Sequence, residues 1–285
     1  MKPAPFRYHA PKTIDETVAL LAEVAREDGR VLAGGQSLVP TMAFRLARPA
    51  HLVDINGVDA LNVLSVEGGM LRIGACVRHA AFHRPVVAGP LGRLLSDVVR
   101  HIGHYPIRTR GTFCGSIAHA DPASEWCTVA AALDATMVAV SLRGMRTIPA
   151  REFFGGVMTT ALAEDELLRE VRLPLLAPDT RFGFYEFSRR AGDFALAMAL
   201  AIYRLEDANV AEPRIAIGGA EPMARRIAVA EQALIARAPT AESFAAAADA
   251  AARVVDPMED AMTTADYRRD LVRTVTRRAL ERSAA

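Results

Sequence analysis

The sequence predicts a mixed helix-and-strand protein made of two or three packed subdomains. The chain has 285 residues and is 51% hydrophobic, which is enough to bury a substantial core. Helical and extended patterns alternate along it, and most of the extended patterns fall in the first two thirds. The C-terminal part, from about Ala224 onward, is dominated by helical patterns. Two kinds of patterning in a chain of this length indicate more than one packed unit.

The first predicted helix has a clear start signal. Thr13 and Glu16 have the spacing of a capping box ahead of VALLAEVA, and Gly29 is a stop signal, so we expect a helix over 14–28. RVLAGG then predicts a short strand that runs into a glycine loop. A second helix, LVPTMAFRLA, and another strand, HLVDI, follow. Strand, glycine turn and helix in this order form the local geometry of an anion site.

The middle of the chain continues with a strand, helical material and a second glycine-bearing loop. These segments are GMLRIGACV, HRPVVAGPLGRLLSDVVRHI and RTRGTFCGSIAHADPASEW. The segment ATMVAVSLRGMRTIP predicts a hairpin and DELLREVRLP a strand. Proline and turn residues in LLAPDT predict a boundary over 175–180. Beyond it, FALAMALAIYRLE and PRIAIGGAEP predict two more strands.

Composition excludes several classes of function. Lys plus Arg is 34 and Asp plus Glu is 33, so the net charge of +1 predicts no nucleic-acid or anionic-membrane partner. The longest apolar stretch, FALAMALAI, is too short to span a bilayer, and no apolar run follows Lys2, so we expect a cytoplasmic protein. The cysteines Cys76, Cys114 and Cys127 form no CxxC pair, which disfavours a disulfide framework or a metal cluster.

The first glycine loop, AGGQSL, has the residue types that a diphosphate cradle requires. A diphosphate needs several backbone N–H donors close to it, and side chains at the contact positions would hold the chain away. Gly34, Gly35 and Ser37 meet that requirement. The pattern is neither GxxxxGK[ST] nor GxGxxG, which disfavours a P-loop or a Rossmann site. A tight structural turn between strand and helix explains the loop equally simply.

The second loop repeats the same chemistry. Gly111, Thr112, Gly115 and Ser116 are again small residues and hydroxyls, and two such loops can hold one extended ligand. Arg108 and Arg110 add positive charge, although a solvated pair is just as plausible. Two interpretations of Glu125 remain open. Its carboxylate could accept hydrogen bonds from the sugar or base of a ligand, or it could stabilise the start of the helix WCTVAAALDA through the helix dipole.

Five motifs in order and spacing resemble a known family. They are AGGQSL at 33–38, IGA at 73–75, RTRGTFCGSIAHADPASE at 108–125, DELL at 165–168 and FSRRAGDFALA at 187–197. The chain resembles the FAD-binding medium subunits of the molybdenum hydroxylases, the group that includes carbon monoxide dehydrogenase, nicotine dehydrogenase and xanthine dehydrogenase. The resemblance covers nearly the whole chain.

The resemblance implies an α+β fold and three divisions. Residues 1–57 and 58–176 would form the two subdomains of a PCMH-type (vanillyl-alcohol oxidase-like) FAD-binding domain, with FAD extended between them. Residues 177–285 would form the C-terminal domain of this family, a small antiparallel sheet with helices.

The resemblance also implies which residues contact FAD. The first loop, which would wrap the diphosphate from one side, supplies Ala33, Gly34, Gly35, Gln36, Ser37 and Leu38. The second would wrap it from the other with Thr112, Cys114, Gly115 and Ser116. Glu125 matches a carboxylate position near FAD, and Leu168 an apolar position packed by it. Phe194 matches the residue that lies against the flavin ring, with Asp193 beside it supporting the turn.

Three positions depart from the commonest family pattern. Gln36 stands where histidine is frequent, Ser116 where asparagine is frequent, and Cys114 where glycine is usual. Because cysteine would be strained at positive φ, we expect Cys114 to have negative φ and a thiol turned away from the phosphates. A small buried residue is the simpler interpretation of this cysteine.

No catalytic or metal-ligating residues are predicted in this chain. No GxSxG elbow or nucleophile–base pair is visible, and the seven histidines have no metal-site spacing. The resemblance therefore implies an electron-transfer flavoprotein subunit of a heteromeric molybdenum hydroxylase. Electrons would come from the 2Fe–2S clusters of a small subunit and leave to an external acceptor, while a large subunit would hold the molybdenum cofactor. A dimer of heterotrimers is expected.

Two other functions fit parts of the sequence. The first is a self-contained flavin reductase or oxidase of the same FAD-binding fold, such as the enolpyruvyl reductase of cell-wall synthesis, which needs its own proton donor close to the flavin. The second is a flavin-free binding module that kept the scaffold. Intact glycines in both loops argue against the second.

Overall fold

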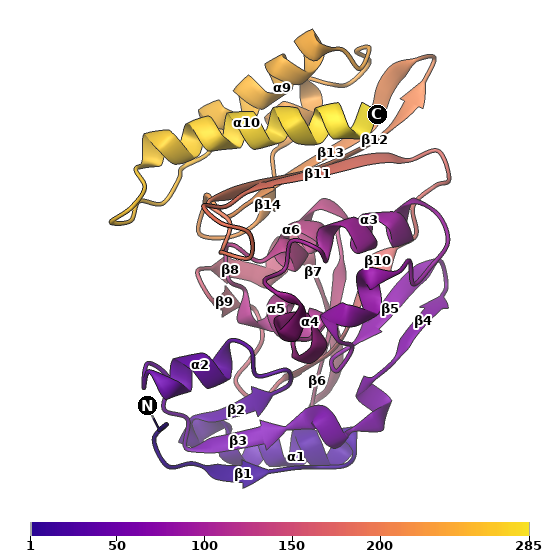
Figure 1. Cartoon of the computed structure of the whole chain (residues 1–285). Coiled ribbons are helices and arrows are strands. Elements are labelled where there is room, and N and C mark those ends of the chain that lie inside the picture. The colour runs from indigo at the N-terminus through magenta and orange to yellow at the C-terminus, as the bar shows by residue number, and fades with distance from the viewer. Residues whose placement is uncertain (1, 285) are drawn as a thin grey trace.

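The computed structural model describes residues 2–284, which form three main sheets with helices between and around them (Figure 1). The N-terminal sheet lies at the bottom of the view, a five-stranded sheet in the middle and a C-terminal sheet at the top. This mixture of parallel and antiparallel sheet with segregated helices confirms the predicted α+β fold class.

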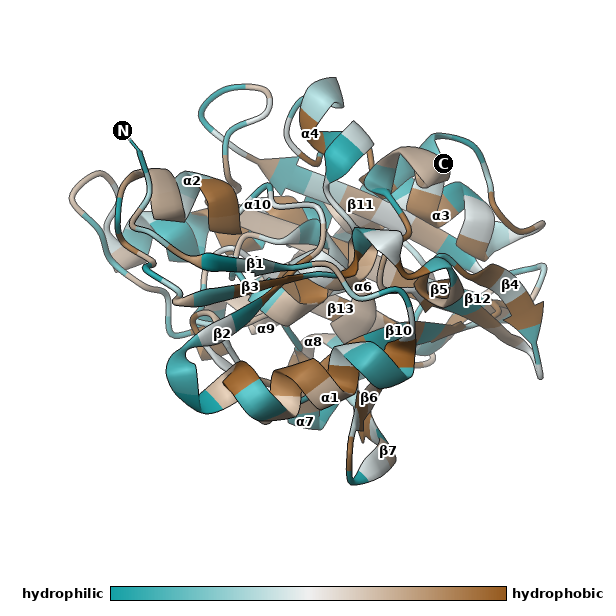
Figure 2. Cartoon of the chain, turned by 90° about the horizontal axis from the view of Figure 1, so that it is seen from below, coloured by the Kyte–Doolittle hydropathy of each residue, from teal (hydrophilic) through white to brown (hydrophobic). Residues whose placement is uncertain are grey.

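The first unit is a parallel sheet in the order β1-β3-β2 with two helices. Its elements are β1 (Arg7–His9), α1 (Ile14–Val24), β2 (Gly29–Leu32), α2 (Leu38–Ala43) and β3 (His51–Asp54). Thr13 caps α1, because its hydroxyl accepts the N–H of Glu16 at 3.1 Å. The helix buries Val18, Leu21 and Val24, and its brown apolar segments are visible in Figure 2.

The middle unit is an antiparallel sheet in the order β4-β5-β10-β6-β7, covered by helices. Its strands are β4 (Leu64–Glu67), β5 (Met70–Gly74), β6 (Thr136–Ser141), β7 (Gly144–Pro149) and β10 (Leu167–Pro174). The helices are α3 (Pro90–Val98), α4 (Tyr105–Arg110), α5 (Phe113–His119), α6 (Glu125–Ala132) and α7 (Ala150–Phe153). Three 3₁₀ turns (Ile55–Gly57, Asp59–Leu61, His79–His83) and a small hairpin of β8 (Phe154–Gly156) and β9 (Thr159–Thr160) complete it.

The C-terminal unit is an antiparallel sheet in the order β11-β12-β13-β14 with three helices. Its elements are β11 (Arg181–Phe187), β12 (Ala197–Glu206), β13 (Asn209–Gly218), β14 (Arg225–Arg226), α8 (Ala228–Gln232), α9 (Ala241–Val254) and α10 (Ala265–Ala284). Figure 1 shows α9 and α10 above this sheet and α3 and α6 below it. The sheet is therefore covered on both faces.

The two faces of this sheet belong to two different cores. One face of β12 carries Met198, Leu200 and Ile202, which join the core of the middle unit. The other face carries Ala197, Ala199 and Ala201, which join the core beneath α9 and α10. Because side chains alternate along a strand, one apolar segment serves both cores. The small alanines let the helices approach the sheet closely.

Most of the predicted elements are confirmed, with differences at their ends. The first helix is α-helical only to Val24 and continues as a 3₁₀ turn, Ala25–Glu27. The left-handed stop that we assigned to Gly29 is taken by Asp28, with φ of 56°. The second helix ends at Ala43, before Arg45 adopts φ of 57°.

Six strands were not predicted from the sequence: β1, β4, β8, β9, β11 and β14. β4 is short and mostly exposed, so it carries little apolar signal. In β11, RFGFYEF, the glycine at 183 interrupts the aromatic alternation. That glycine is required by packing: a Cβ there would lie 2.0 Å from the carbonyl oxygen of Ala279 on α10.

Candidate functional site

The first glycine loop leaves the end of β2 and leads into α2, as predicted. Within residues 2–284, the N–H groups of Gly34, Gly35, Gln36 and Ser37 donate to no protein acceptor. The loop is partly exposed, so these four amides can donate to water or to a ligand. A run of N–H groups of this kind suits an anionic ligand.

The two glycines of this loop are needed for different reasons. A Cβ at Gly34 would lie 2.3 Å from the carbonyl oxygen of Arg110 and 2.6 Å from Cα of Gly111. Gly34 therefore permits the first loop to touch the second. Gly35 has φ of 71°, a left-handed conformation that other residues adopt only with strain.

The second glycine segment is more helical than predicted. α4 ends at Arg110 and α5 begins at Phe113, so only Gly111 and Thr112 lie between two short helices. The Thr112 hydroxyl accepts the N–H of Gly115 at 3.0 Å and caps α5. The prediction of a loop over this whole segment was wrong, because the capping signal inside RGTFCGS was taken for phosphate-binding chemistry alone.

The side chains of two residues that were not predicted as site residues connect the two glycine segments by hydrogen bonds. The Asn56 side chain donates to the carbonyl of Ala33 at 2.8 Å. Its amide oxygen accepts from Arg78 Nη2 at 2.5 Å, and Arg78 Nη1 donates to the carbonyl of Arg110. The backbone spacing of both segments is thus fixed by one amide and one guanidinium. These partners lie 22 to 32 residues apart, so no local pattern marks them.

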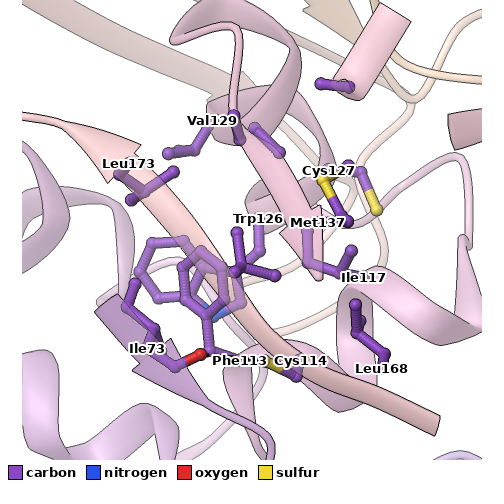
Figure 3. Close-up of a cluster of buried hydrophobic side chains, with 14 of the residues drawn as sticks. Ile73, Phe113, Cys114, Ile117, Trp126, Cys127, Val129, Met137, Leu168 and Leu173 are labelled. Carbon is purple, nitrogen blue, oxygen red and sulfur yellow. Dashed lines mark hydrogen bonds between the residues drawn. The ribbon is translucent and has the colours of Figure 1, made fainter. Parts of the chain in front are cut away.

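The side chains of Cys114 and Leu168 both lie in the hydrophobic core that packs against the second glycine segment. Cys114 lies inside α5 and is not among the residues with positive φ, which confirms the predicted backbone conformation. Its thiol donates to the carbonyl of Ile73 at 3.2 Å, and burial raises its pKa. Leu168 is 4% exposed, and Figure 3 shows it in the same cluster as Cys114 and Ile117. A contact of either side chain with FAD stays a prediction.

Gly115 and Ser116 lie in the first turn of α5 and are partly buried. A Cβ at Gly115 would lie 2.7 Å from the Thr112 hydroxyl that caps the helix. The carbonyl of Ser116 accepts from the thiol of Cys127. The cap therefore accounts for this glycine, and the hydroxyl of Ser116 remains available to a ligand role.

The segment between β11 and β12 brings Phe194 from the C-terminal unit. Gly192 has φ of 87°, and a Cβ there would lie 2.4 Å from the ring of His104, so this turn rests on the start of α4. The N–H of Asp193 donates to the carbonyl of Arg190 at 3.1 Å, while its side chain is exposed. Phe194 is 76% exposed, which excludes a plain core role for it.

Glu125 begins α6 and is partly buried. Burial raises the pKa of its carboxyl to about 7, whereas a helix dipole acting alone would lower it. Its carboxyl interacts with that of Glu186 on β11, and each shifts the pKa of the other, an interaction that sequence reasoning missed. The pKa of Glu125 thus depends on a group from the other unit as well as on its own helix.

Over residues 2–284, no group of three or more His, Cys, Asp or Glu side chains is arranged to hold a metal ion. In the same part of the chain, none of the helices has the length and apolar character needed to cross a membrane.

Two family models match the chain. Residues 4–176 match the FAD binding domain in molybdopterin dehydrogenase, and residues 182–283 match the CO dehydrogenase flavoprotein C-terminal domain. The chain belongs to the FAD-binding medium subunits of the molybdenum hydroxylases. This confirms the resemblance and identifies the protein as an oxidoreductase subunit that binds FAD.

Similar proteins cover the full length of this medium subunit. The nicotine 6-hydroxylase medium subunit of Paenarthrobacter nicotinovorans is 37% identical over 100% of this chain and 99% of its own length. The carbon monoxide dehydrogenase medium chain of Hydrogenophaga pseudoflava is 37% identical over 98% of this chain and 97% of its own. These relatives are subunits of multi-subunit enzymes.

Solved structures have the same fold. A chain of the Hydrogenophaga pseudoflava carbon monoxide dehydrogenase that lacks the Mo-pyranopterin moiety superposes with a TM-score of 0.95 at 38% identity, covering 100% of this medium subunit and 99% of that chain. A chain of quinoline 2-oxidoreductase from Pseudomonas putida 86 gives a TM-score of 0.92 at 35% identity, covering 100% and 98%.

The described residues fit FAD. The four free amides of the first loop provide donors for a diphosphate, and bare backbone at Gly34 and Gly35 lets such a ligand approach closely. The exposed ring of Phe194 offers an aromatic face with no protein partner to displace.

Proposed function

We propose that this medium subunit carries electrons through FAD, from the 2Fe–2S clusters of a small subunit to an external acceptor. The observation that supports this most directly is the run of four free amides in a loop that touches the second glycine segment. When bound, FAD supplies the redox chemistry. The chain's own residues would hold the diphosphate between 33–38 and 112–116, and the aromatic ring of Phe194 would cover the flavin.

We propose an assembly with an iron–sulfur small subunit and a molybdenum large subunit, doubled by two-fold symmetry. The full-length similarity to medium subunits of such enzymes supports this proposal. The three cysteines are free and buried, which suits a cytoplasmic location where thiols stay reduced.

The proposed assembly is tested by comparing substrate oxidation by the isolated medium subunit with oxidation by the three subunits together. The purified medium subunit should carry FAD yet oxidise no aldehyde, purine or N-heterocycle, because the proposed site of hydroxylation lies in another subunit. Turnover of one of these substrates should appear only when the small and large subunits are added. Substrate-dependent turnover by the isolated, metal-free chain would contradict the proposal.

One observation favours a second candidate, a self-contained flavin reductase. That function needs a proton donor close to the flavin, and burial raises the pKa of Glu125 to about 7, so this carboxyl can exchange a proton near neutral pH. Reduction of an added enoyl compound by the isolated FAD-loaded chain with NADH or NADPH would favour this candidate. No such turnover is expected for a medium subunit.

Replacing Phe194 with alanine is expected to change the flavin absorbance or reduction potential while leaving FAD affinity within about threefold, because the diphosphate contacts are remote. The side chain is 76% exposed, so no loss of folding stability is expected. Leu142→Ala, at a residue 65% exposed in the β6–β7 turn, is a matched control that should leave the flavin spectrum unchanged. A spectrum and potential identical to the native protein in Phe194→Ala would place this ring away from the flavin.

A further inference from the structure

A buried pair of carboxyl groups joins the C-terminal unit to the FAD-binding unit. Glu186 lies on β11, the edge strand of its sheet. It shares the face of Phe182 and Phe184, both of which pack on the core of the FAD-binding unit. Only 5% of its side chain is exposed. Its carboxyl interacts with that of Glu125, at the start of α6 on the opposite unit, and each shifts the pKa of the other.

Nothing in the described structure neutralises Glu186. Its Oε2 atom is buried and accepts no hydrogen bond from residues 2–284. The Nδ1 atom of His101 lies 3.9 Å away, beyond hydrogen-bond distance. Burial lowers the pKa of His101, which favours the neutral imidazole. A buried carboxylate without a partner is costly, so this geometry favours a carboxyl group that keeps its proton.

Other charged groups surround the pair but are engaged elsewhere. Arg108 on α4 donates to the carbonyls of Ile102 and Gly103, each at 2.9 Å. Arg282 on α10 donates to the carbonyl of Phe184. Asp121, before α6, adds negative charge near Glu125 and accepts the N–H of Ala123. Asp97 on α3 faces His101 rather than the pair.

Two carboxylates in contact repel each other, so they titrate as a unit. Burial raises the pKa of Glu125 and of Glu186, and their mutual repulsion adds to the rise at Glu186. This is the pattern of a carboxyl–carboxylate pair that holds one proton between two oxygens.

We propose that Glu186 shares one proton with Glu125 across the junction of the two units, and so acts as a positioning residue that presents Glu125 as a hydrogen-bond donor to FAD. The second half rests on the proposed FAD site, because Glu125 is a contact of FAD only by family position. No covalent step is involved. The proton moves only between the two carboxyl groups and solvent.

The proton pair is tested without FAD, by the pH dependence of thermal unfolding. A carboxyl whose pKa is raised by folding stabilises the fold fully below its ordinary pKa of 4.5 and loses this contribution as pH rises through 7 and then 9. Glu186→Gln removes the like charge and keeps a hydrogen-bonding side chain. From pH 6 to pH 9, the melting temperature of the native protein should fall by about 3 °C more than that of Glu186→Gln.

Glu164→Gln is the matched control, because Glu164 is exposed. It should follow the native profile. Parallel pH profiles of the native protein and Glu186→Gln would overturn the shared proton. Infrared difference spectra of the native protein provide a check that needs no variant: a protonated-carboxyl band should be present at pH 7 and lost by pH 10, and its absence at pH 7 would also overturn the pair.

The effect on FAD is tested by titrating the apoprotein with FAD across the same pH range. Native affinity should weaken by about tenfold as the pair loses its proton, since one hydrogen bond to FAD is lost. Glu125→Gln, which keeps a donor at every pH, should bind FAD with little pH dependence. Equal pH dependence in the native protein and Glu125→Gln would overturn the donor role while leaving the proton pair intact. Failure of the native protein to bind FAD at any pH would instead contradict the proposed function.

Discussion

Gly34→Ala should bind FAD at least about a hundredfold more weakly than the native chain while remaining folded. A Cβ at this position would lie 2.3 Å from the carbonyl oxygen of Arg110, and backbone on that side has little room to move. The two glycine segments would separate, and the free amides of the first loop would move away from the second segment. Losing two hydrogen bonds to a charged ligand costs about 3 kcal/mol or more, which corresponds to at least about a hundredfold in affinity.

Titration of the apoprotein with FAD, followed by flavin fluorescence, measures this change. Gly183→Ala is the matched control, since it places the same methyl group 2.0 Å from the carbonyl oxygen of Ala279 in the C-terminal unit. That variant should lose about 1–3 kcal/mol of folding stability through overpacking but bind FAD nearly normally. Native affinity in a folded Gly34→Ala protein would show that contact between the two segments is not needed for the site.

Arg268→Ala should cost about 3 kcal/mol of folding stability, the largest loss we expect from any single arginine described here. The side chain of Arg268 is 7% exposed and lies on α10. Its guanidinium donates to the carbonyls of Leu196 at 3.1 Å and Gly219 at 2.8 Å, and to Asp260 at 2.6 Å. Removing it would leave buried carbonyl oxygens without a donor.

Urea unfolding monitored by circular dichroism measures the loss. The adjacent Arg269 is the control, because its partner Asp266 is 94% exposed and a surface pair of this kind contributes at most about 0.5 kcal/mol. Leu196 follows the Phe194 turn, so Arg268→Ala should also disturb the flavin spectrum of the loaded protein. Equal stability of Arg268→Ala and Arg269→Ala would contradict the importance of this buried guanidinium.

The sequence was sufficient for the parts of the fold that depend on local pattern. Three local predictions are confirmed, because each is encoded by neighbouring residues. They are the cap at Thr13, the hairpin of ATMVAVSLRGMRTIP, observed over 136–149, and the strand of FALAMALAIYRLE, observed over 197–206. The family was also identified from sequence motifs, and the matches to the two family models confirm it. The helices around Gly111 were not predicted, because glycine and threonine serve helix ends as readily as phosphate loops.

The contacts that position the candidate site were beyond the reach of the sequence alone. Asn56 and Arg78 join two segments that only tertiary folding brings together. Glu186 gave no signal, since an acidic residue in a half-polar strand is ordinarily a solvated side chain. Its burial arises because β11 lies between α10 and α3 of the FAD-binding unit, and both helices are distant from β11 in sequence.

The sheet of the C-terminal unit also limits how this chain can be divided. The two family models meet between residues 176 and 182, which invites expression of either half as a separate fragment. A cut there would strip Phe184, Met198, Leu200 and Ile202 from the core that they complete in the other half. Each fragment would present a wide apolar surface to water, the condition that drives aggregation. The cofactor-binding half is therefore best studied within the intact polypeptide. Some of the residues that complete its hydrophobic core lie after residue 176, where its family model ends.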